Sequence, residues 1–131
     1  MSLMPHTPIV KTPKKTRILL VEDHGPTRIA MAKLMRDAGA DVVTARDGEE
    51  GLGMLVTQHF DVLLTDLMMP VMDGVELVDR CLKLPDTHRP GRVIAISGAY
   101  DSGALHGLPV QFLPKPLTVD SVLDLIGGKL N

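Results

Sequence analysis

The sequence has few of the residues that build disulfides, aromatic cores or membrane segments. Its single cysteine, Cys81, allows no internal disulfide and no thiolate metal site, which suits a reducing cytoplasm. Its three aromatic residues, Phe60, Tyr100 and Phe112, leave the core to Val, Leu, Ile, Met and Ala. No apolar run approaches the roughly 18 residues of a membrane span, and residues 1–10 lack the apolar segment of a signal peptide. We therefore expect a cytoplasmic protein without membrane contact.

Acidic residues are absent from the first 17 positions, which hold three prolines and four basic residues. This composition predicts a flexible, basic, proline-rich tail over residues 1–15, followed by one domain over residues 16–128. From residue 18 on, the chain carries 10 of its 14 basic residues and all 16 acidic residues, a formal charge of −6. A net acidic domain is a poor candidate for direct binding of nucleic acid.

Short apolar segments alternate with amphipathic ones along the domain. The apolar segments predict buried strands at residues 17–22, 42–45, 62–66, 92–97 and 110–113. The amphipathic segments predict helices at about 26–38, 48–58, 74–84 and 118–126, and the glycine-rich stretch 98–107 predicts a short or irregular one. This alternation predicts an α/β fold: a flavodoxin-like, doubly wound parallel sheet of five strands in the order 2-1-3-4-5.

Chemically active residues stand where the predicted strands end. The first strand ends at Glu22 and Asp23, the third at Asp66, the fourth at Ser97 and the fifth at Lys115. The carboxyl ends of parallel strands meet at one edge, where open α/β sheets bind ligands. Because strands one and three are neighbours in this order, three carboxylates should lie within a few ångströms of one another. Such a cluster repels itself unless it holds a cation, and oxygen ligands favour Mg²⁺.

The remaining strand-end residues fit phosphoryl transfer to a carboxylate. Ser97 can donate a hydrogen bond to a phosphoryl oxygen, and Lys115 can pair with it as a point charge. Each residue alone has an ordinary interpretation, as a solvated turn, a helix cap or a surface lysine. Their joint occurrence at four strand ends favours the functional interpretation. The histidines, among them His24, His59 and His88, show no ligand spacing and are interpreted as surface residues.

The same residues resemble the receiver domains of two-component response regulators, including those of hybrid histidine kinases. The resemblance covers about residues 16–128 and is carried by Val21-Glu22-Asp23, Asp66-Leu67-Met68-Met69-Pro70, Asp73-Gly74, Ser97 and Lys115-Pro116. It implies that a sensor histidine kinase or a histidine phosphotransfer domain is the partner that donates a phosphoryl group. It also implies a signalling switch that dephosphorylates slowly, rather than an enzyme with turnover, and it leaves homodimerisation open.

The resemblance also implies a role for each matching residue. Asp66 is the phospho-acceptor, and Ser97 and Lys115 contact the phosphoryl group. Asp23 binds Mg²⁺ directly, Glu22 assists through water, and Asp66 and the backbone carbonyl of Met68 are further ligands. Phe112, three residues before the lysine, matches an aromatic switch position that turns inward when Ser97 moves toward the phosphate.

Two departures from the receiver pattern lie after the fourth strand. Only 17 residues separate Ser97 from Lys115, so about one turn of the fourth helix is missing, and Gly98 stands where alanine is usual. The shortened fourth helix motivates an alternative, a receiver-like interaction module that works without phosphorylation. A third and weaker option is a flavodoxin-like protein that binds a flavin or nucleotide. Against it, this sequence has no glycine-rich phosphate loop after the first strand.

Overall fold

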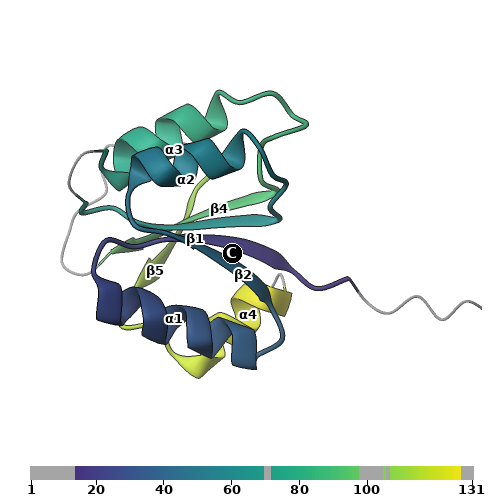
Figure 1. Cartoon of the computed structure of the whole chain (residues 1–131), viewed down its shortest axis with the longest axis vertical. Coiled ribbons are helices and arrows are strands. Elements are labelled where there is room, and N and C mark those ends of the chain that lie inside the picture. Colours follow the sequence, from purple (N-terminus) through teal and green to yellow (C-terminus); the bar gives the residue numbers. More distant parts are fainter. Residues whose placement is uncertain (1–13, 70–71, 98–104, 106, 128–131) are drawn as a thin grey trace, which may run out of the picture.

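A five-stranded parallel sheet runs through the centre of the molecule (Figure 1). The computed structural model describes residues 14–69, 72–97, 105 and 107–127. The strands are β1 (Arg17–Val21), β2 (Asp41–Ala45), β3 (Val62–Asp66), β4 (Arg92–Ser97) and β5 (Gln111–Pro114). Their order is β2-β1-β3-β4-β5, and every neighbouring pair is parallel. The predicted fold class and strand order are therefore confirmed.

Helices cover both faces of the sheet (Figure 1). Among the described residues they are α1 (Gly25–Asp37), α2 (Gly48–Leu55), α3 (Gly74–Leu82) and α4 (Val119–Gly127). In the figure, α2 and α3 lie together on one face, and α1 and α4 on the other. Helices α2 and α3 end two or three residues earlier than predicted, and β5 begins one residue later. The expected short helix at 98–107 and the expected tail at 1–15 lie mostly outside the described residues.

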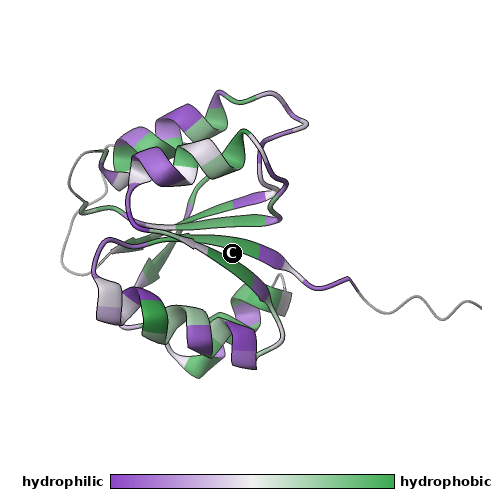
Figure 2. Ribbon diagram, viewed as in Figure 1, coloured by the Kyte–Doolittle hydropathy of each residue, from purple (hydrophilic) through white to green (hydrophobic). Residues whose placement is uncertain are grey.

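The core is aliphatic and is divided by the sheet into two clusters. Alternate strand residues point to opposite faces, so Leu19 and Leu63 pack toward α2 and α3, while Leu20 and Leu64 pack toward α1 and α4. All four are fully buried, and Figure 2 shows the strands as apolar through the middle of the molecule. Burial on both faces explains why the sequence has continuous apolar runs here rather than alternation.

Polar residues fix where the helices begin. Asp47, Asp73 and Thr118 each accept a hydrogen bond from the backbone N–H three residues later, at 2.8–3.0 Å. His24 caps α1 in the same way, with its ring Nδ1 accepting from the Thr27 N–H at 3.3 Å. His24 and His59 are exposed, as predicted, and His88 is half-buried. The capping role of His24 was not predicted. Each cap turns the chain from a strand end into the following helix.

Candidate functional site

The pairing of β1 with β3 brings acidic residues together at the carboxyl edge of the sheet. Val21 stands beside Thr65 in the parallel register, so the next residues, Glu22 and Asp66, come into proximity. Carboxylate oxygens of Glu22, Asp23 and Asp66 all lie within 4.8 Å of one another. Glu22 is fully buried, Asp66 is 5% exposed and Asp23 is exposed. The predicted acidic cluster is present, with two acids inside and one at the rim.

Lys115 joins the two buried acids. It follows β5, and its Nζ lies 2.9 Å from Glu22 Oε1 and 2.9 Å from Asp66 Oδ2. Its peptide bond to Pro116 is cis. Lys115 therefore crosses the edge of the sheet to stand between the ends of β1 and β3, which sequence spacing alone does not show.

Burial and charge shift the pKa values of this pair. Burial raises the pKa of Glu22 to about 6; the hydrogen bond from Lys115 lowers it, and the neighbouring Asp66 raises it. Burial lowers the pKa of Lys115, but hydrogen bonds to Asp66 and Glu22 outweigh it and leave the pKa above its ordinary value. Lys115 is therefore a cation at neutral pH, and one positive charge faces the acidic cluster.

The loop after β3 holds the Asp66 carboxylate from the other side. The backbone N–H of Met68 donates to Asp66 Oδ1 at 3.1 Å, so each carboxylate oxygen has its own donor. The two ends of this loop are joined, because the Gly74 N–H donates to the Leu67 carbonyl at 3.1 Å. A Cβ on Gly74 would lie 2.1 Å from the Asp66 carbonyl oxygen, so this approach requires glycine.

The donor set suits a hard divalent cation. All three clustered side chains offer carboxylate oxygens, which Mg²⁺ prefers over nitrogen or sulfur. Asp23 is exposed at the rim, where a cation could keep some of its water. One lysine does not balance three acids, and a divalent cation would offset the surplus. The residues present therefore fit Mg²⁺.

Ser97 and Phe112, the two other predicted residues, lie on β4 and β5. Ser97 ends β4 and pairs with Pro114, which puts its backbone at the same edge as Asp66. The Ser97 side chain lies outside what the structure describes. Phe112 is on β5, opposite Ala95, and is 42% exposed. The structure thus brings the acids and the lysine together and leaves Phe112 exposed, while the role predicted for the Ser97 side chain stays a prediction.

Comparison with known proteins decides the family. A model of the response regulator receiver domain matches residues 18–126. The chain belongs to the response regulator receiver domain family. The response regulator receiver protein Anae109_2439 of Anaeromyxobacter sp. (strain Fw109-5) is 36% identical over 112 residues, which are 83% of this chain and 46% of that protein. Sensor protein EvgS of Escherichia coli (strain K12) is 40% identical over 68 residues, 52% of this chain and 6% of that protein. The chain spans less than half the length of these two relatives.

Solved receiver structures share the fold of this receiver domain. The receiver domain of the hybrid histidine kinase CckA has 31% identity and a TM-score of 0.69, over 88% of this chain and 99% of that one. Chemotaxis protein CheY4 of Vibrio cholerae has 25% identity and a TM-score of 0.77, over 89% of this chain and 100% of that one. Among the described residues, no helix has the length and apolar character needed to cross a membrane.

One residue near the site of this receiver domain was missed by reasoning from the sequence. Arg28, in α1, donates to the carbonyl oxygens of Glu22 at 3.0 Å and Asp23 at 3.4 Å. The sequence carries only a weak indication of this role. Arg28 stands close to the start of a predicted helix, where acidic residues are favoured and a basic one is unusual.

Proposed function

We propose that this receiver domain accepts a phosphoryl group on Asp66 from a phosphohistidine of a sensor histidine kinase or a histidine phosphotransfer domain. The observation that carries the proposal is the position of the Lys115 ammonium, 2.9 Å from both Glu22 and Asp66. A cation bonded to a nearly buried carboxylate can offset the negative charge that arrives with a phosphoryl group. Family membership supports the same function.

The chemistry is a transfer between two nucleophiles. An oxygen of the Asp66 carboxylate forms a bond to phosphorus while the bond from phosphorus to the donor's histidine nitrogen breaks. The electron pair of the broken bond leaves with the imidazole, and Asp66 becomes an acyl phosphate. The Met68 N–H orients the carboxylate, Lys115 pairs with the transferred group, and Ser97 is proposed to donate to one of its oxygens.

The acidic cluster is proposed to hold Mg²⁺ through Glu22, Asp23 and Asp66, with the backbone carbonyl of Met68 as a further ligand. When bound, Mg²⁺ supplies positive charge that offsets repulsion between the acids and the incoming phosphoryl oxygens. Of the three acids, Asp23 is the exposed one, so a cation from solvent would reach the cluster on its side.

Phosphorylation is proposed to shift the domain between two conformations. The added group carries about two negative charges at neutral pH and competes with Glu22 for Lys115. Ser97 would move toward the phosphate, and Phe112, which is 42% exposed here, would turn into the space it leaves.

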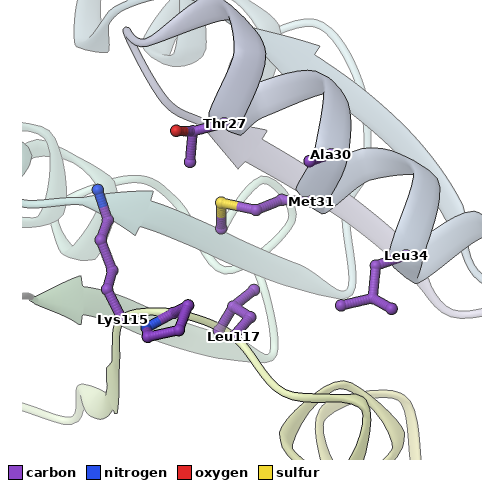
Figure 3. A pocket seen from close by; sticks show the side chains of 7 residues that line it. Thr27, Ala30, Met31, Leu34, Lys115 and Leu117 are labelled. Carbon is purple, nitrogen blue, oxygen red and sulfur yellow. The ribbon is translucent and has the colours of Figure 1, made fainter.

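A groove of about 480 Å³ beside the site is proposed to receive the donor's helix (Figure 3). It is lined by Thr27, Ala30, Met31 and Leu34 of α1 and by Lys115, Pro116 and Leu117 after β5. Because Lys115 lines the groove and also bonds Asp66, a helix docked there would carry its phosphohistidine to the acceptor. The exposed Ala30 offers a test: Ala30→Glu should slow transfer from a phosphorylated phosphotransfer domain without slowing labelling by acetyl phosphate. Equal slowing of both would contradict this docking site.

Mass spectrometry tests the central proposal. Incubation with acetyl phosphate and MgCl₂ should add one phosphoryl group to the protein, and Asp66→Asn should add none. Asp61→Asn, at the opposite edge of the sheet, is the control and should behave like the unmodified protein. No mass gain, or an equal gain in Asp66→Asn, would contradict the proposal. An interaction module that works without phosphorylation would give no gain and would bind Mg²⁺ no better than Asp23→Ala.

A further inference from the structure

Arg28 contacts the backbone of the acidic site without a role in the proposed transfer. It is the fourth residue of α1, and its side chain is half-buried. Its Nη1 donates to the carbonyl oxygen of Glu22 at 3.0 Å and to that of Asp23 at 3.4 Å. Its Nη2 lies 3.7 Å from the point where a Cβ on Gly25 would stand, so the guanidinium folds back over the loop between β1 and α1.

The local electrostatics of α1 do not favour a cation at this position. The amino end of a helix carries partial positive charge, which stabilises acidic residues and destabilises basic ones nearby. The first turn of α1, which the structure describes completely, contains no acidic residue to offset Arg28. The benefit of Arg28 must therefore come from its contacts outside the helix.

Those contacts complete the anchoring of Glu22. Its N–H donates to the Ala45 carbonyl at 3.1 Å. Its Oε1 accepts from Lys115 at 2.9 Å, and its Oε2 accepts from the His24 N–H at 3.4 Å. The hydrogen bond from Arg28 holds the remaining polar atom of Glu22, its carbonyl oxygen, so the backbone and the side chain are both fixed.

We propose that Arg28 is a positioning residue for metal binding. Its guanidinium joins the carbonyls of Glu22 and Asp23 and so holds both carboxylates in the arrangement that Mg²⁺ needs. Groups that orient metal ligands typically change metal affinity by about 10–100-fold when they are removed. The inference rests on the proposed function, because it requires this receiver domain to bind Mg²⁺.

The sign of the effect separates positioning from charge. By Coulomb's law alone, removing a cation near the acids should strengthen Mg²⁺ binding. If Arg28 positions the loop, removing it should weaken binding instead. If Arg28 served only overall stability, a similar arginine elsewhere on the helix should affect Mg²⁺ affinity as much as Arg28 does.

Arg36 provides the matched control. It lies near the other end of α1, and its Nη2 donates to the Val42 carbonyl at 2.7 Å. Arg36→Met therefore removes the same kind of guanidinium–carbonyl contact from the same helix, far from the acidic site. The comparison isolates what the position of Arg28 contributes.

Isothermal titration calorimetry with MgCl₂ on the full chain tests the proposal. We expect about 10-fold weaker binding for Arg28→Met and unchanged binding for Arg36→Met. Arg28→Lys should lose less, because an ammonium can replace one of the two hydrogen bonds. Equal or tighter binding by Arg28→Met, or an equal loss in Arg36→Met, would overturn the inference.

Two further outcomes are distinguishable. If the unmodified protein shows no Mg²⁺ binding, the proposed function fails, whatever the variants do. If circular dichroism shows that Arg28→Met does not fold, Arg28→Lys decides the question. Binding by Arg28→Lys as tight as in the unmodified protein would then overturn the inference, and weaker binding would support it.

Discussion

The amino ends and the carboxyl ends of the strands form two edges of the sheet, and both edges carry acidic and basic residues. The two edges differ in how closely their charges are balanced and how deeply they are buried. At the amino edge, Arg17 Nε lies 3.4 Å from Asp41, and the Arg17 backbone N–H donates to Asp61 at 2.8 Å. The Arg17 guanidinium also lies 4.7 Å from the centre of the Phe60 ring. At the carboxyl edge, the Lys115 ammonium contacts two acids, and a third carboxylate lies within 4.8 Å of them.

This contrast distinguishes a structural edge from a functional one. Arg17 meets opposite charge in partly exposed surroundings, where water also solvates the ions. Glu22 is fully buried beside a second carboxylate, and its pKa is raised to about 6. Folding alone does not balance the charge at this edge, which is typical of a site prepared for a ligand.

The largest effect is expected when the carboxyl edge loses its cation. Lys115→Met should lower the free energy of unfolding by about 3 kcal/mol in Mg²⁺-free buffer, because the buried carboxylates of Glu22 and Asp66 lose the cation that they share. The expected loss is at the low end for such changes, because the Lys115 side chain is 32% exposed and water partly solvates its charge. Urea unfolding measures the loss. Lys33→Met, which breaks an exposed pair with Asp37 on α1, is the control and should lose about 0.5 kcal/mol or less. Equal losses in the two variants would remove the contrast between the edges.

The next largest effect is an increase in the free energy of unfolding, which we expect when the buried charge of Glu22 is removed. Its pKa is about 6 in the folded state against an ordinary 4.5, so the folded state binds the proton more tightly than the unfolded state does. The stability linked to this proton is present below about pH 4.5 and is lost as pH rises through 6. Above pH 6, the charged Glu22 therefore disfavours folding.

Glu22→Gln should consequently raise the free energy of unfolding by about 2 kcal/mol at pH 7.5 without Mg²⁺, and by far less at pH 4. Urea unfolding at both pH values checks the sign. The same substitution should weaken Mg²⁺ binding, since it removes a carboxylate from the cluster. A loss of stability at pH 7.5, or a gain of equal size at both pH values, would contradict this account of the edge.

Adding Mg²⁺ should offset the surplus negative charge at the carboxyl edge and should not change the amino edge. Mg²⁺ at ten times its dissociation constant should stabilise the protein by about 1.4 kcal/mol. The stabilisation should disappear in Asp23→Asn, which alters the exposed acid of the cluster. It should remain in Asp61→Asn, whose carboxylate accepts from Arg17 at the other edge. Thermal unfolding with and without MgCl₂ measures this, and stabilisation retained in Asp23→Asn would contradict the metal site.

The fold and the acidic cluster could be predicted because they depend on local patterns. The apolar run at 62–64 indicated a strand buried on both faces, and the residue that ends it, Asp66, had to lie at the ligand edge. The strand order then placed Glu22 and Asp23 beside it. No distance was needed for these steps, only the alternation of strands and helices.

The rest depends on side-chain paths that no local pattern contains. The complete burial of Glu22, and its sharing of Lys115 with Asp66, depend on how side chains from β1, β3 and the segment after β5 pack against one another. A glycine inside a helix, such as Gly51 in α2, is ordinarily destabilising. Here a Cβ at Gly51 would lie 2.8 Å from Val21 Cγ2, so the glycine allows α2 to pack closely on β1. Such contacts join positions far apart in the chain, and sequence spacing does not encode them.

The smallest effect is expected at the amino edge, where Asp41→Asn breaks the ion pair with Arg17. The Arg17 and Asp41 side chains are 30% and 56% exposed, so water and salt screen the pair. The free energy of unfolding should therefore fall by about 0.5 kcal/mol or less. Raising the NaCl concentration should shrink this difference further. Arg17 keeps its hydrogen bond to the His59 carbonyl at 2.7 Å, which holds it in place without Asp41. Urea unfolding and Mg²⁺ titration of this variant complete the comparison. A loss as large as that of Lys115→Met, or any change in Mg²⁺ affinity, would show that the two edges do not differ in the way their charges predict.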